Sequence, residues 1–87
     1  MFDVISIKDV KLSLGEWCKT YRKQNELSQE ALADNLNLSR ITIQKLENGK
    51  NVTIDTLLKV AYHFDKLQII NQYLKTDIDN ANVPSLY

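Results

Sequence analysis

Two helix-start signals follow each other between Leu27 and Leu46, and they constrain the fold more than any other part of the chain. In each, a leucine is followed directly by a serine, and a second large apolar residue stands four positions after that serine. The serine oxygen can accept a hydrogen bond from the first turn of a helix, while the two apolar residues pack together as a hydrophobic staple. The spacing therefore predicts two short helices in close succession.

A sharp turn must separate these two helices. Asn37 follows the apolar residues of the first one, and after glycine asparagine is the commonest residue to accept the left-handed conformation that ends a helix. The pattern predicts a helix over about 29–36, a turn of three or four residues and a helix over about 40–48. This arrangement is a helix-turn-helix unit, which places its second helix in the major groove of DNA.

Three further helices are predicted from periodicity and from repeated start signals. The first runs from about residue 10 or 13 to residue 24, because its apolar residues recur at helical spacing. Val52-Thr53 and Phe64-Asp65 repeat the cap and staple, so helices are predicted over about 54–63 and 66–75. The last helix has an apolar set wider than one stripe, which is typical of a helix that touches a partner as well as its own core.

We therefore predict one all-α domain of five helices over residues 10–75. A chain of 87 residues suffices for a single small domain, and two glycines and one proline favour helices over a turn-rich β fold. Residues 1–9 are expected to form an N-terminal arm or a short strand that pairs with a two-fold mate, or else a merely packed or disordered terminus. Residues 76–87 lack periodicity and are expected to form a mobile C-terminal tail or an extended partner-binding segment.

The residue types argue against catalysis, metal binding and membrane insertion. The single cysteine, Cys18, lies on the apolar stripe of the first helix, so we interpret it as a buried hydrophobe rather than a reactive thiol. The single histidine, His63, has no second ligand at metal spacing, and no nucleophile–base pair or phosphate-binding glycine loop is present. Neither a signal peptide nor a membrane-length apolar run occurs. We expect a cytoplasmic protein that is not an enzyme and uses no cofactor.

The net charge speaks against simple nucleic-acid binding, because 11 basic and 11 acidic residues cancel and DNA-binding domains usually carry a basic excess. The charges are unevenly distributed, however, with Asp77 and Asp79 near the end of the chain. The part of the chain up to residue 50 contains a basic set: Lys19, Arg22, Lys23, Arg40, Lys45 and Lys50. A locally basic face on a neutral protein is expected to bind DNA weakly as a monomer and to depend on dimer formation.

The segment from Leu14 to about Ile70 resembles the lambda-repressor-like (Cro/XRE-type) helix-turn-helix domain family. The residues that carry the resemblance are Arg22, Leu27-Ser28-Gln29, Leu32-Ala33, Ser39, Ile43, Leu46-Glu47-Asn48-Gly49-Lys50, Thr53, Leu57 and Leu58. The resemblance implies five helices, a homodimer, a palindromic operator in double-stranded DNA and an ion pair between Arg22 and Glu47. Glu26 and Asn37 stand where many members carry glycine, so strained turns are expected there.

Position on the third predicted helix assigns roles in DNA contact. Four residues near its start, on the side away from Ile43 and Leu46, are predicted to reach base edges: Arg40, Ile41, Gln44 and Lys45. Arginine suits guanine, glutamine suits adenine and isoleucine suits the thymine methyl group. Five residues are predicted to hold phosphates: Ser28, Gln29, Thr42, Asn48 and Lys50. For Arg40, Gln44 and Lys45 the alternative is a solvated helix face.

Three functions remain open at this point. The first is a sequence-specific transcriptional regulator, most simply a repressor whose subunits read half-sites about one helical turn apart. The second is an antitoxin, because small members of the family often neutralise a toxin protein encoded beside them and repress the shared operon. The third is a protein-interaction module that has lost DNA binding.

Overall fold

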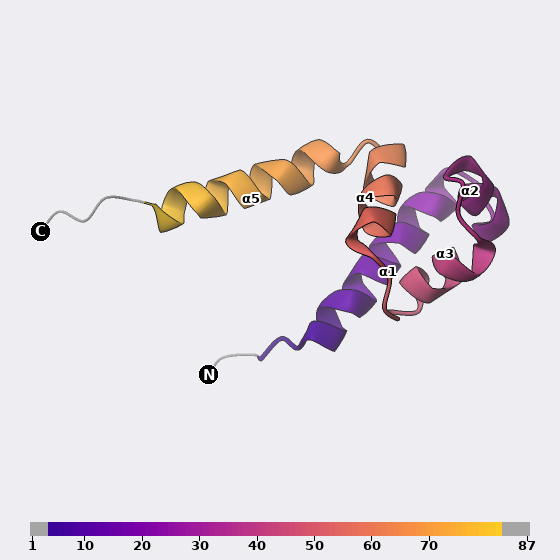
Figure 1. The fold of residues 1–87 in the computed structure, drawn as a ribbon, viewed down its shortest axis with the longest axis horizontal. Helices are drawn as coiled ribbons and strands as arrows, with labels where there is room; N and C mark the ends of the chain where they lie inside the picture. Colours follow the sequence, from indigo (N-terminus) through magenta and orange to yellow (C-terminus); the bar gives the residue numbers. More distant parts are fainter. Residues whose placement is uncertain (1–3, 83–87) are drawn as a thin grey trace, which may run out of the picture.

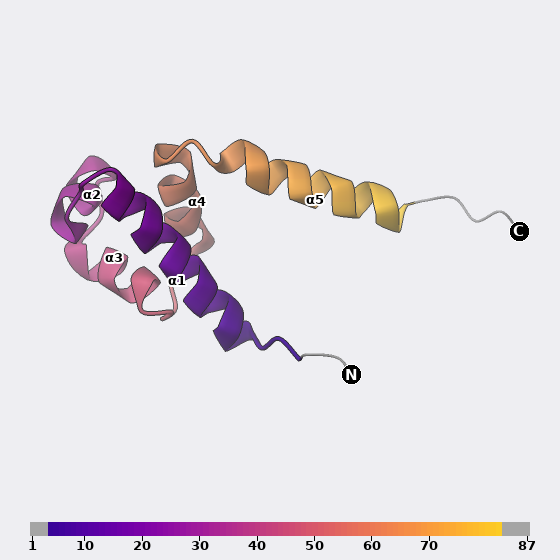
Figure 2. The ribbon, with the colours of Figure 1, turned by 180° about the vertical axis from the view of Figure 1, so that it is seen from behind.

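Five helices make up the structure, a computed structural model that describes residues 4–82 (Figure 1). They are α1 (Ile7–Gln24), α2 (Gln29–Asn35), α3 (Arg40–Glu47), α4 (Ile54–His63) and α5 (Leu67–Ala81), and no strand occurs among the described residues. The predicted all-α fold of five helices is confirmed. In both views α1 to α4 form one body, while α5 leaves the end of α4 and projects away from it (Figures 1 and 2).

Hydroxyl side chains begin α2, α3 and α4 as the sequence predicts. The Ser28 Oγ accepts a hydrogen bond from the backbone N–H of Ala31 at 3.0 Å. The same contact recurs where Ser39 receives the N–H of Thr42 at 3.2 Å and where Thr53 receives the N–H of Thr56 at 3.1 Å. The apolar residue before each cap packs against the core: Leu27, Leu38 and Val52. Each helix start is therefore fixed both by a hydrogen bond and by an apolar contact.

The first four helices end in the same backbone motif. In each, a residue with positive φ follows the helix, and two N–H groups reach back to carbonyls of its last turn. After α2, the N–H of Leu38 donates to the Ala33 carbonyl at 2.8 Å and that of Asn37 donates to Asp34 at 3.2 Å. The positive-φ residues are Glu26 (55°), Asn37 (57°), Asp65 (61°) and Gly49 (71°). Only the glycine adopts this conformation without a steric cost from its side chain.

Glu26→Gly is expected to raise the free energy of unfolding by about 1 kcal/mol. A β-carbon in the left-handed region costs about 1–2 kcal/mol, and the greater freedom of glycine in the unfolded chain offsets about 0.4–1 kcal/mol of that gain. Urea unfolding monitored by circular dichroism measures the change. Glu30→Gly, inside α2, is the matched control, and its free energy of unfolding should fall by about 1 kcal/mol. A loss in both variants would contradict a strained turn at Glu26.

A small core lies where α1 to α4 meet. Leu32, Ile43, Val60 and Cys18 are fully buried. Ala33 is 1 % exposed, and its small side chain suits the close crossing of α2 and α3. The interpretation of Cys18 as a buried hydrophobe is confirmed, because its side chain has no exposed surface. Burial and the neighbouring carboxylate of Glu47 raise the pKa of its thiol to about 12. At neutral pH this cysteine is not a thiolate nucleophile.

The N-terminal end of α1 differs from the expectation. The helix begins at Ile7, earlier than the predicted start at residue 10 or 13, and residues 4–6 form no strand. The reason is a capping box: the Ser6 Oγ accepts from the N–H of Asp9, and the Asp9 carboxylate accepts from the N–H of Ser6, both at 3.0 Å. The prediction of a strand is therefore wrong for residues 4–9. Residues 1–3 of the predicted arm lie outside the described residues.

The C-terminal part also differs. Helix α5 continues to Ala81, so residues 76–81 of the predicted tail are helical; no glycine or proline interrupts them, and Ile78 continues the apolar spacing of the helix. Phe64-Asp65 does not cap α5, because Asp65 takes the left-handed position that closes α4, and Lys66 begins α5 without a side-chain cap. Residues 83–87 of the predicted tail lie outside the described residues.

Candidate nucleic-acid interface

Helix α3 is fixed at the surface by two apolar side chains that point inward. Ile43 is fully buried and Leu46 is 3 % exposed. The helical period then turns the four residues predicted to contact bases away from the core. Arg40, Ile41 and Lys45 are exposed, and Gln44 is half-buried. Ile41 is an apolar side chain with 58 % exposure, so part of the outward side of α3 offers apolar contact.

The residues predicted to hold phosphates lie at the ends of α2 and α3. Ser28 caps α2, and the Thr42 hydroxyl lies 2.9 Å from that of Ser39 at the start of α3. Asn48 and Lys50 follow α3 and are exposed. The side chain of Gln29 points inward, where its Nε2 donates to the Glu47 carboxylate at 3.0 Å. What Gln29 offers to a phosphate is therefore its backbone N–H in the first turn of α2.

An open depression connects the outward side of α3 with the loop that follows it. Its lining residues are Ile41, Gln44, Lys45, Asn48, Lys50 and Asn51. Five of these six were predicted to contact DNA, and Asn51 was not. The Asn51 Oδ1 accepts a hydrogen bond from the Lys11 Nζ, which brings α1 to the edge of the depression. Lys11 is distant from Asn51 in the sequence, and no local signal points to this pairing.

The charge of this surface differs from that of the whole chain. Between Ser39 and Val52 the exposed charged side chains are Arg40, Lys45 and Lys50, all of them basic. The one acidic residue in this stretch, Glu47, has its side chain 3 % exposed and is paired with Arg22. The exposed charges of α3 and the loop after it are therefore all positive although the chain carries no net charge, which suits contact with a phosphate backbone.

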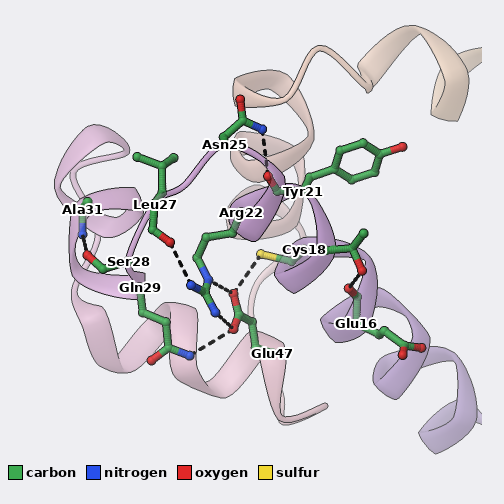
Figure 3. Close-up of polar contacts among 11 residues, drawn as sticks. Glu16, Cys18, Tyr21, Arg22, Asn25, Leu27, Ser28, Gln29, Ala31 and Glu47 are labelled. Atoms are coloured by element: carbon green, nitrogen blue, oxygen red, sulfur yellow. Dashed lines mark hydrogen bonds and ion pairs between the residues drawn. The ribbon is translucent and has the colours of Figure 1, made fainter.

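A buried ion pair lies beneath this surface (Figure 3). Arg22 donates from Nε to the Glu47 Oε2 at 2.7 Å and from Nη2 to Oε1 at 2.9 Å. Its third nitrogen, Nη1, donates to the carbonyl oxygen of Leu27 at 2.9 Å. Gln29 also donates to the Glu47 carboxylate, and the Cys18 Sγ lies 3.7 Å from the Glu47 Oε2. The pair that the family resemblance implied thus joins α1, the turn before α2, the start of α2 and the end of α3.

The environment of Glu47 keeps it ionised. Burial alone would raise the pKa of this carboxyl, but hydrogen bonds from Arg22 and Gln29 and the arginine charge outweigh burial and hold the pKa below its ordinary value. A buried carboxylate with several donors is rigid as well as charged. The ion pair therefore acts as a positioning element, which sets the orientation of α3 relative to α1 and α2.

A short turn between two helices, with the second presenting a basic, partly apolar side to solvent, defines a DNA-binding helix-turn-helix regulator. A protein-family model described as helix-turn-helix matches residues 19–69, which contain all of α2, α3 and α4. The chain belongs to this family, of the Cro and lambda-repressor (XRE) type. The comparison with curated proteins gives no match. No helix in residues 4–82 is long and apolar enough to cross a lipid bilayer.

Proposed function

We propose that this protein represses transcription by binding a palindromic operator in double-stranded DNA as a homodimer. The observation that carries the proposal is the outward side of α3, where Arg40 and Ile41 are exposed and Gln44 is half-buried. Ile43, on the opposite side, is fully buried. With α3 in the major groove, Arg40 suits a bidentate contact with guanine and Gln44 one with adenine, and Ile41 suits a thymine methyl group. Lys45 lies on the same side and reaches a neighbouring base edge.

Phosphate contacts on both sides of α3 would set its register in the groove. The start of α2 offers Ser28 and the backbone N–H of Gln29, while Thr42, Asn48 and Lys50 lie along and after α3. Contacts of this kind position the protein without reading sequence. Lys11 and Asn51, joined by a hydrogen bond at the edge of the depression, add a further basic group to this set.

A second candidate function is that of an antitoxin, which binds a toxin protein and represses their shared operon. The exposed apolar residues of α5 favour it, because Tyr73 and Leu74 are 76 % and 58 % exposed and large exposed apolar residues on one helix are typical of protein-binding surfaces. Co-purification of the chain with the product of the neighbouring gene separates this function from repression alone. The third candidate is a protein-interaction module that does not bind DNA. A gel-shift experiment in which the protein does not retard DNA even at low salt would favour it.

Arg40→Ala and Lys50→Ala are expected to differ in kind. Removing a bidentate base contact should relax the preference at one base pair by about 1–3 kcal/mol, whereas removing a phosphate contact should weaken all sequences alike and reduce the salt slope by about 1. Affinities measured over a set of single-base operator variants report both effects. Lys75→Ala, on α5, is the control and should leave every affinity unchanged. A uniform loss in both α3-region variants would show that the roles are wrongly assigned.

A further inference from the structure

The N-terminal half of α1 runs beside the end of α3 and the loop that follows it (Figures 1 and 2). Lys11 donates to Asn51 of that loop, and Leu12 covers Gly49, where a Cβ would lie 2.8 Å from the Leu12 Cδ2. One turn later, Gly15 lies against backbone carbonyls at the end of α3. These residues of α1 precede residues 19–69, which the family model matches. The loop after α3 is therefore held by a part of the chain outside the helix-turn-helix unit.

The hydrogen bond between Lys11 and Asn51 fixes the orientation of the Asn51 amide. A lysine ammonium can only donate, so the atom that it contacts must be the amide oxygen, Oδ1. The two N–H donors of Nδ2 are then on the side of the amide away from Lys11. Asn51 is exposed and lines the depression beside α3. At the edge of this surface, the side chain of Asn51 therefore offers hydrogen-bond donors, which an anion requires.

Three lysines lie around Asn51 without acidic partners. Lys50 lines the depression beside α3 together with Lys45, and it lines a second, mainly apolar depression together with Lys11. Neither depression has an acidic lining residue, and the ion pairs found within residues 4–82 include none of these lysines. Like charges held close together repel, and a bound anion removes that repulsion. The ammonium of Lys11 also keeps two of its three donors after bonding to Asn51.

We infer that Lys11 and Asn51 form a phosphate clamp, in which the Lys11 Nζ and the Asn51 Nδ2 bind the same phosphate of the DNA backbone beyond the C-terminal end of α3. Both groups are donors and one is a point charge, so the clamp suits a phosphate oxygen. Lys11 is also a positioning residue, because it orients the Asn51 amide. The inference rests on the proposed function and extends its DNA interface from the helix-turn-helix unit to the N-terminal half of α1.

Lys11→Met tests the clamp, because methionine removes the charge and the donors but keeps an unbranched side chain over the apolar depression. Gel-shift titrations of the full chain use a duplex that the wild type enriches from a random pool and an unrelated duplex. Lys11→Met should bind both about fivefold more weakly at low salt, and its plot of log affinity against log salt should be shallower by about 1. Lys11→Arg should restore the slope. Lys75→Met, the same charge change on α5, is the control and should leave the slope unchanged.

Ethylation interference identifies the phosphate itself. Lys11→Met and Asn51→Ala should lose interference at the same phosphate of each half-site and keep it at the others. If the hydrogen bond only braces the loop, Lys11→Met will unfold at a lower temperature while its salt slope and interference pattern stay those of the wild type, and the clamp is overturned. Loss at two different phosphates also overturns it. A wild type that binds no duplex overturns the proposed function and the clamp together, so the two failures are distinguishable.

Discussion

Gly15→Ala is expected to lower the free energy of unfolding by about 3 kcal/mol, although alanine is the better helix former by about 1 kcal/mol. A β-carbon at this position of α1 would lie 2.5 Å from the carbonyl oxygen of Leu46 and 2.7 Å from that of Glu47. Both are backbone atoms at the end of α3, so no side-chain rotation relieves the overlap. The two helices must move apart, and the buried contacts between them weaken.

Thermal and urea unfolding measure this loss. Ser13→Ala, on the exposed part of the same helix, is the matched control and should be neutral or slightly stabilising, because only helix propensity changes there. If Gly15→Ala proved as stable as Ser13→Ala, the close approach of α1 and α3 at this glycine would be refuted.

Glu47→Ala has an effect of similar size for a different reason. The substitution leaves the Arg22 guanidinium, with its side chain 10 % exposed, as a charge that has lost its buried partner, which typically costs about 3–5 kcal/mol. Unfolding by urea measures the loss. Asp55→Ala is the control, because it breaks an exposed ion pair of 3.3 Å between Asp55 and Lys59, and pairs of that kind contribute less than about 1 kcal/mol. Equal losses of stability in Glu47→Ala and Asp55→Ala would show that burial of the Arg22–Glu47 pair adds nothing to its contribution.

The same carboxylate makes stability depend on pH. The folded state lowers the pKa of Glu47 below its ordinary value of 4.5, so the folded state binds this proton less readily than the unfolded state does. The stabilisation is complete above the ordinary value and is lost as the pH falls through the folded pKa. In Glu47→Gln this acid-dependent part of the unfolding curve should be absent.

The sequence predicts the middle of the chain closely because its signals there are local. A serine or threonine cap with an apolar staple depends on residues within one turn, and α2, α3 and α4 begin where Ser28, Ser39 and Thr53 place them. Once Ile43 and Leu46 are assigned to the core, the helical period alone predicts which residues of α3 face solvent. Membership of the helix-turn-helix family, predicted from the same spacing, is confirmed.

The errors have physical causes at particular residues. The apolar, β-branched run before Ser6 has the composition of a strand, but the capping box with Asp9 begins a helix instead. Aspartate can cap the start of a helix and can also adopt positive φ. Asp65 adopts positive φ at the end of α4 and does not cap α5. No local pattern marks Gly15, because its importance arises only from contact with α3. The hydrogen bond between Lys11 and Asn51 likewise depends on tertiary structure.

The central claim is that the outward side of α3 reads DNA sequence. Selection of bound duplexes from a random pool tests it most directly, performed in parallel with the wild type and with Arg40→Ala. We expect the wild type to enrich two inverted half-sites separated by a whole number of helical turns, and Arg40→Ala to enrich the same motif with one base pair in each half-site no longer specified. Enrichment of no motif by the wild type, or of an identical motif by both proteins, would contradict the assignment of α3 as the reading helix.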